Sequence, residues 1–185
     1  PGTIPGTVRY QVVVDGVART DLRGILGPLR NLVVVAGPLL AQEVAWRADR
    51  TAAVTVLTWV LRAPGATGVT VIDPGPNDIA HWQQVAREVE QRGARIERIL
   101  LTHGHLDHSA GARLFAEAAG CTVQALDPAH QYGSEGLVGG DVIDESGVEI
   151  HVVATPGHSS DSLFFYLPQD GSILTGDTVL GRGTT

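Results

Sequence analysis

Three histidines and one aspartate lie within six consecutive residues, in the segment His103-Gly104-His105-Leu106-Asp107-His108. Imidazole and carboxylate groups are the ligands of borderline transition metals, zinc above all. The segment follows the apolar run Ile99-Leu100-Leu101, and Ser109 opens what reads as a helix. Because further ligand-type residues follow later in the chain, the pattern predicts a metal-binding loop rather than a solvated histidine-rich loop.

Two of those further residues, His158 and Asp177, each come directly after a predicted strand, in a loop that contains glycine. Loops at one edge of a sheet core can converge, while the sheet fixes their positions. Two sets of three ligands can be drawn. The first set is His103, His105 and His158. The second set is Asp107, His108 and Asp177, with the last bridging both metals.

Three imidazoles that leave a fourth position open are the arrangement of a catalytic zinc. Two ions about 3.5–4 Å apart can share a hydroxide and clamp a substrate oxygen, and zinc lowers the pKa of bound water to about 7. We therefore expect one or two zinc ions, with iron or manganese as alternatives. The predicted reaction is attack of a zinc-bound hydroxide on a small-molecule ester, thioester or lactone. Asp107 would orient the hydroxide and carry protons.

Five other chemically capable residues receive plainer interpretations. His81 opens an amphipathic helix and is expected to be exposed. His130 lies in a polar loop that could line a substrate cleft, and His151 lies in a strand as a packed or a surface residue. Cys121 is expected to be a small buried residue. Asp73 ends a strand as the ligands do, and we expect it to orient the metal loop by hydrogen bonding.

The size and composition favour one globular domain over residues 1–185, with 43% hydrophobic residues and 23 glycines. The net charge is −7 and no run of Lys or Arg stands out, which argues mildly against nucleic acid. A single cysteine excludes an internal disulfide and suits a reducing compartment. The longest apolar stretch, Leu32 to Leu40, is too short to span a bilayer, and no basic-then-apolar leader opens the chain. The expectation is a cytoplasmic protein without a membrane segment.

Strands outnumber helices in the predicted element order. Helices are expected at 79–91 and about 109–119. The main strands are expected at 10–14, 17–19, 32–36, 55–62, 69–72, 95–101, 121–126, 142–143, 148–154, 162–167 and 172–175. Hairpins alternate with strand–helix units, so the sequence predicts an α+β fold with helices covering the outer faces of a sheet core.

The motifs at 102–108, 155–159 and 175–177, together with Asp73-Pro74-Gly75, resemble those of the metallo-β-lactamase fold superfamily. The resemblance implies an αββα sandwich with the metals at one edge of the two sheets, held by the two ligand sets above. An aspartate at the bridging position resembles the glyoxalase II, lactonase and nuclease branches. The tail from Gly176, with His158-Ser159-Ser160-Asp161, is most similar to the β-lactamase-like protein 2 subgroup, whose members are described as hydrolases and endoribonucleases.

The chain departs from that family near its end. The family supplies a further histidine well after the bridging aspartate, whereas this chain ends eight residues past Asp177. We therefore expect a C-terminally truncated sandwich of impaired activity, in which the three-histidine site keeps its metal more tightly than the second site. Apolar surface exposed by the missing segment would favour a homo-oligomer.

Two alternatives to the small-molecule hydrolase remain. An endoribonuclease would need a basic rim near the metals, and only Arg113 and Arg182 lie close in sequence, so RNA is not favoured. A truncated scaffold that binds metal with little catalysis is the other alternative. Metal-dependent cleavage of single-stranded RNA, set beside a thioester assay, would separate the nuclease from the hydrolase. Turnover of generic ester, thioester and β-lactam substrates with added zinc would test the scaffold.

Overall fold

The computed structural model describes residues 55–145, 147–169 and 171–178, together with four strands earlier in the chain: β1 (Tyr10–Val14), β2 (Val17–Arg19), β3 (Val33–Ala36) and β4 (Gln42–Arg47). Side chains are described for residues 58–144, 147–169 and 171–178. Arg182, which was considered for a basic rim, lies outside the described residues. The first three strands form one antiparallel sheet in the order β2-β1-β3.

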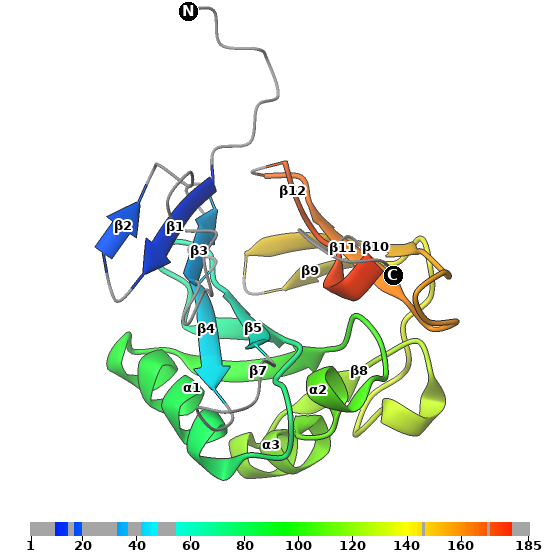
Figure 1. Cartoon of the computed structure of the whole chain (residues 1–185), viewed down its shortest axis with the longest axis horizontal. Helices are drawn as coiled ribbons and strands as arrows, with labels where there is room; N and C mark the ends of the chain where they lie inside the picture. The colour runs from blue at the N-terminus through cyan, green and yellow to red at the C-terminus, as the bar shows by residue number, and fades with distance from the viewer. Residues whose placement is uncertain are drawn as a thin grey trace, which may run out of the picture.

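A five-stranded sheet in the order β4-β5-β6-β7-β8 carries the histidine-rich segment (Figure 1). Its other strands are β5 (Thr55–Leu61), β6 (Gly68–Ile72), β7 (Arg95–Leu100) and β8 (Thr122–Gln124). The strands from β4 to β6 pair antiparallel, whereas β6, β7 and β8 pair parallel because helices connect them. The carboxyl ends of β6 and β7 therefore open at the same edge of the sheet.

A four-stranded antiparallel sheet supplies the second layer, in the order β12-β11-β10-β9. Its strands are β9 (Val142–Glu145), β10 (Val148–Ala154), β11 (Leu163–Leu167) and β12 (Ser172–Leu174). Burial alternates along β11, where Leu163, Phe165 and Leu167 are fully covered, as expected for a strand with one face in a core.

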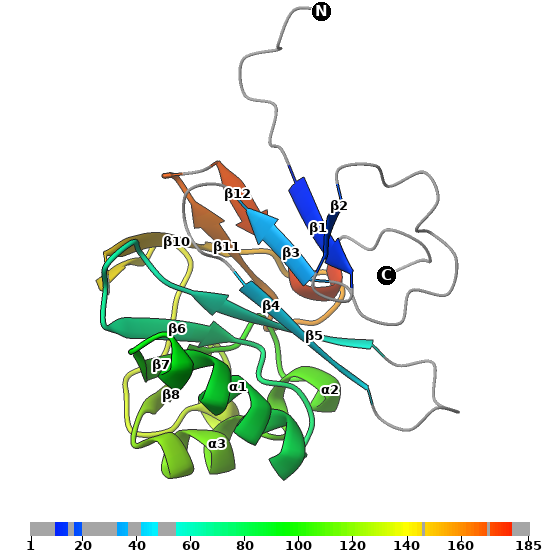
Figure 2. The same ribbon diagram turned by 90° about the vertical axis from the view of Figure 1, so that its left-hand side faces the viewer.

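Two hydrophobic clusters define the layers. One lies between the two large sheets and includes Ile72, Leu100, Ile150 and Phe165. The other joins the opposite face of the five-stranded sheet to the helices α1 (Ile79–Gln91) and α3 (Ala112–Ala119). Figures 1 and 2 show both helices on that side only. The α+β class is confirmed, and in the described part of the chain the order is helices, sheet, sheet.

Helix α1 begins after Asp78, whose carboxylate accepts a hydrogen bond from the His81 backbone N–H, as an N-cap residue should. Two expectations for this helix are wrong. His81 is 1% exposed, whereas Ile79 is 63% exposed. The helix is rotated so that His81 faces the sheet, because the His81 ring has a hydrogen-bonding partner there, the hydroxyl of Thr58.

The predicted helix from Ser109 to Ala119 is in fact two elements. The short helix α2 spans Leu106–Ser109, inside the histidine-rich motif, and α3 starts only at Ala112. Gly111 marks the break, because its backbone N–H donates to the carbonyl of Gly75 instead of continuing α2. A β-carbon at Gly111 would lie 2.5 Å from the indole nitrogen of Trp82, so only glycine fits there.

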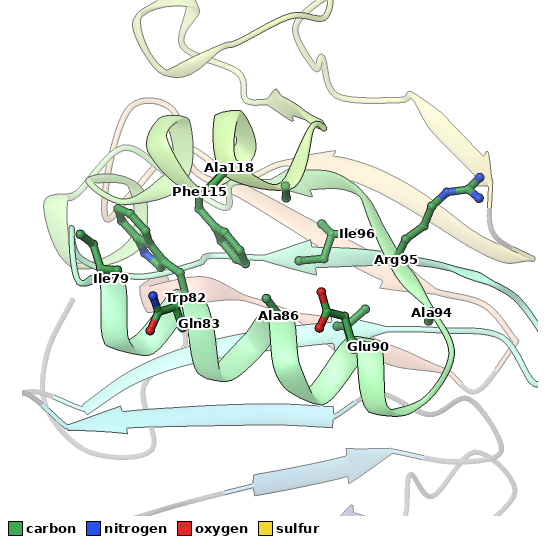
Figure 3. A pocket seen from close by; sticks show the side chains of 12 residues that line it. Ile79, Trp82, Gln83, Ala86, Glu90, Ala94, Arg95, Ile96, Phe115 and Ala118 are labelled. Carbon is green, nitrogen blue, oxygen red and sulfur yellow. The ribbon is translucent and has the colours of Figure 1, made fainter.

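A cavity of about 340 Å³ lies between α1 and α3 (Figure 3). Small side chains such as Ala86, Ala94 and Ala118 leave this space, and Trp82 and Phe115 close one end with ring centroids 6.0 Å apart. None of the six predicted ligands lines the cavity. It is part of the helix packing and separate from the histidine cluster.

Candidate metal centre

The three histidines of the first predicted set converge. His103 Nε2 lies 3.1 Å from His105 Nδ1, and His158 Nε2 lies 3.0 Å from the same atom. His103 and His105 leave the end of β7, while His158 follows β10 in the other sheet. His103 is buried and His105 is exposed, so the group opens to solvent on one side.

The second predicted set lies against the first. His108 Nε2 lies 3.3 Å from Asp177 Oδ1 and 3.8 Å from Asp107 Oδ2. Asp177, in the short 3₁₀ helix η2 (Gly176–Thr178), also places Oδ2 3.9 Å from His158 Nε2. Asp177 therefore faces both sets of residues. Asp107 is the most peripheral member, with 46% of its side chain exposed.

The side chain of Asp73 links the two sets of residues. Its carboxylate is buried and accepts hydrogen bonds from the Thr102 backbone N–H at 2.8 Å and from the Thr102 hydroxyl at 2.6 Å. His108 Nδ1 lies 3.0 Å from the same carboxylate. Asp73 thus orients one predicted ligand directly and supports the residue that precedes another.

These contacts determine which ring nitrogens keep a free lone pair that could bind a metal. The Thr102 hydroxyl gives its only proton to Asp73, so its oxygen must accept from His103 Nδ1, which lies 3.1 Å away. This leaves the Nε2 lone pair of His103 facing His105. In the same way, the Nδ1–H of His108 donates to Asp73 and directs Nε2 at Asp177. Metal-binding histidines are commonly held in this way, with the second nitrogen donating to a carboxylate or another acceptor.

The electrostatics of the cluster differ between its two halves. Burial lowers the pKa of His103, and the neighbouring His108 and His105 act in the same direction. Burial also works to lower the pKa of His108, but the hydrogen bond and charge of Asp73, with the charge of Asp177, raise it to about 9. Without metal, His108 is therefore protonated at neutral pH, and a cation must displace that proton.

Hydrogen bonds across the sheet edge hold the ligand loops together. The backbone N–H of Leu163 donates to the carbonyl of Thr102 at 2.8 Å and so ties the second sheet to the histidine-rich loop. Gly176, with φ +48, packs so closely on Thr102 that a β-carbon would lie 2.5 Å from its hydroxyl. Glycine is therefore required next to Asp177 both for backbone conformation and for space.

The remaining residues singled out in the sequence have varied positions. His130 is half-buried in the 3₁₀ helix η1 (Pro128–His130), beside Gly104, and groups with Asp127 and Asp161. His151 is half-exposed and pairs with Glu149. Cys121 is buried as expected, and burial raises the pKa of its thiol to about 11.

Sequence reasoning missed the contribution of Thr58 and His81. Thr58 is fully buried in β5, and its hydroxyl lies between His81 and the backbone carbonyl of Asp73. A threonine in a strand rich in β-branched residues carries no signal of its own. A polar side chain at the start of an amphipathic helix gave the only hint.

The donor set fits a transition-metal ion. Ring nitrogens and carboxylate oxygens of His103, His105 and His158, and of His103, His108 and Asp177, lie within 4.8 Å of one another in two groups of three. Imidazole nitrogens and carboxylate oxygens in such groups suit zinc and its neighbours in the first transition row.

A sequence profile of the metallo-beta-lactamase superfamily matches residues 52–185, and the chain belongs to that superfamily. Two curated relatives bear on its chemistry. The chain is 40% identical over 123 residues to an atrochrysone carboxyl ACP thioesterase of Aspergillus fumigatus, covering 62% of this chain and 38% of the relative. It is 32% identical over 126 residues to a hydroxyacylglutathione hydrolase of Idiomarina loihiensis, covering 68% and 47%. The matched region thus spans less than half the length of these relatives.

Solved structures show the same fold. The structure of ETHE1 from Myxococcus xanthus superposes with a TM-score of 0.59 at 20% identity, covering 75% of this chain and 58% of that one. A metallo-beta-lactamase family protein from Thermus thermophilus superposes with a TM-score of 0.62 at 21% identity, covering 80% of this chain and 61% of that one.

Within the described residues, no helix is both long and apolar enough to cross a membrane.

Proposed function

We propose that this chain is a metal-dependent hydrolase that cleaves thioesters of small molecules, with esters and lactones as related substrates. The observation that carries the proposal is that five of the six predicted ligands, His103, His105, His108, His158 and Asp177, form two overlapping groups of three. The sixth, Asp107, lies beside them, with Oδ2 3.8 Å from His108 Nε2. The thioesterase and hydroxyacylglutathione hydrolase among the relatives support a thioester substrate.

The two sets of side chains have different parts in this proposal. His103, His105 and His158 would hold one ion, and Asp107 and His108 would hold a second, with Asp177 between them. When bound, zinc, or iron or manganese in its place, would supply Lewis acidity and a water of lowered pKa.

Asp107 is the proposed catalytic group. Its carboxylate is exposed at the mouth of the cluster and is the least constrained of the acidic ligands. From there it can orient a water for attack on the substrate carbonyl and take up the proton that this water loses. Asp73, behind the cluster, fixes the tautomer of His108 directly and that of His103 through Thr102.

The test compares two histidine variants in a thioester-cleavage assay with an acyl-glutathione substrate and added Zn²⁺. His103→Ala removes the buried ligand shared by both groups of three and should abolish zinc-dependent cleavage. His151→Ala removes a half-exposed histidine outside the cluster and should leave the rate within about twofold. Equal rates for both variants would contradict the proposal.

The other hypotheses have less support. A nuclease would need cations around the cluster, but Arg113 is paired with Glu117 and lies over the ring of Tyr132. Tight zinc binding without cleavage of thioester, ester or lactone would instead favour the metal-binding scaffold of impaired activity.

A further inference from the structure

Asp73 has an unusual backbone for the residue that organises the metal centre. Its φ is +50, and it is the only residue other than glycine with positive φ in the described part of the chain. Aspartate adopts this left-handed conformation more readily than most residues, but the conformation still costs free energy. It persists only where contacts with neighbouring residues offset that cost. What fixes the backbone of Asp73 therefore also fixes its carboxylate.

Two hydrogen bonds hold that backbone. The Asp73 N–H donates to the carbonyl of Leu100 at 3.0 Å, which ties it to the end of β7. On the other side, the Thr58 hydroxyl donates to the Asp73 carbonyl at 2.9 Å. Thr58 is 0% exposed, so no water competes for this contact.

Thr58 is in turn held by α1. His81 Nε2 lies 2.9 Å from the Thr58 hydroxyl, and His81 is 1% exposed. The His81 backbone is itself fixed, because its N–H donates to the N-cap carboxylate of Asp78. A continuous polar path thus runs from the first turn of α1 to the backbone of Asp73, whose carboxylate contacts His108.

Counting protons assigns the direction of this path. Burial lowers the pKa of His81 to about 4, against the charge of Asp78 and a hydrogen bond to the Pro74 carbonyl, so the ring is neutral at pH 7. Its one N–H lies either on Nδ1, toward Pro74, or on Nε2, toward Thr58. A carbonyl oxygen only accepts, so the single Thr58 proton points at Asp73. Both contacts of Thr58 are therefore satisfied only when the proton of His81 is on Nε2.

We propose that His81 is a positioning residue of the metal centre, which acts through Thr58 to hold the backbone of Asp73 and, through its carboxylate, the ligand His108. The proposal rests on the metal centre described under the proposed function. Residues one step outside a metal site commonly change metal affinity by about 10–100-fold when lost. Asp73 is that residue here, and Thr58 and His81 act only through it, so we expect an effect at the lower end of this range, about tenfold.

The experiment measures Zn²⁺ affinity by competition with a chromophoric chelator. Thr58→Val and His81→Leu should each weaken Zn²⁺ binding about tenfold, and the double variant should be no weaker than either, because both break the same path. Val85→Ala is the matched control, since it creates a cavity under α1 and Val85 has no place in the hydrogen-bonded path from His81 to Asp73. It should lower stability to denaturant but leave Zn²⁺ affinity unchanged.

Three results would overturn the inference: unchanged affinity in the two single variants, additive losses in the double variant, or equal loss in Val85→Ala. Nitrogen-15 chemical shifts of the His81 ring in the metal-free wild type provide a readout that does not depend on the variants folding. The Nε2–H tautomer supports the path, and the Nδ1–H tautomer, donating toward Pro74, contradicts it. A wild-type chain that binds no Zn²⁺ would overturn the proposed function, while the tautomer would still decide this inference.

Discussion

The metal-free chain should lose stability as the pH rises above neutrality, because of one buried ion pair. The pKa of His108 is raised from 6.5 to about 9, chiefly through Asp73 once the opposing effect of burial is overcome. A group with a raised folded-state pKa contributes stability that is fully present below its unfolded pKa and disappears as the pH passes its folded pKa. The expected loss therefore falls between about pH 6.5 and pH 9.

The magnitude follows from the size of the shift. Each pKa unit corresponds to about 1.4 kcal/mol, so the full contribution of His108 is about 3 kcal/mol. Roughly 2 kcal/mol of it should disappear between pH 7 and pH 8.5. The lowered pKa values of His81 and His103 oppose this slope only slightly, because an unfolded histidine with a pKa of 6.5 is only partly protonated at pH 7 and has lost nearly all of that proton by pH 8.5.

The assay is urea unfolding of the chelator-treated chain, followed at several pH values from 7 to 8.5. Asp73→Asn removes the charge and should flatten the dependence, whereas Asp144→Asn, which changes an exposed carboxylate, should keep it. A free energy of unfolding that is constant or rises with pH in the wild type would refute the assignment of His108 as a buried cation.

Three further predictions concern metal binding and turnover. Asp107→Asn should lower kcat of thioester cleavage about 100-fold with KM changed only a few-fold, because Asp107 is exposed and acts on protons rather than on folding; an unchanged kcat would remove it from the mechanism. The second Zn²⁺ equivalent should bind more weakly than the first at pH 7 and gain about tenfold in affinity per pH unit, since His108 must lose its proton; two equal affinities by isothermal titration would contradict this. Gly104→Ala should weaken Zn²⁺ binding, because its β-carbon would lie 2.3 Å from His130 Nε2, and His130→Ala in the same chain should restore it; failure of that rescue would show that the clash lies elsewhere.

The sequence predicted which residues form the histidine and aspartate cluster because their positions follow from local rules. His103, His158 and Asp177 each follow a strand, and β10 and β12 end at the same edge of their sheet because both pair antiparallel with β11. The orienting role expected for Asp73 rested on the same reasoning, and its contacts with Thr102 and His108 agree with it.

The polar path behind the ligands could not be read from the sequence. His81 and Thr58 are 23 residues apart, and neither segment contains a sequence pattern that predicts their contact. Hydrophobic periodicity placed Ile79 inside and His81 outside, because it scores side chains by type and ignores a hydrogen-bonding partner within the sheet. The break at Gly111 was missed for a similar reason, since the acceptor that ends α2 is the carbonyl of Gly75, far along the chain.

The most direct test of the whole account is thioester cleavage by the chain at a fixed concentration while Zn²⁺ is titrated from zero to two equivalents. The account predicts negligible cleavage of an acyl-glutathione substrate without metal, a rate that rises with Zn²⁺ occupancy, and loss of that rate in His103→Ala. A chain that binds Zn²⁺ at the histidine cluster and shows no cleavage at full occupancy would contradict it, as would cleavage that persists after the metal is removed.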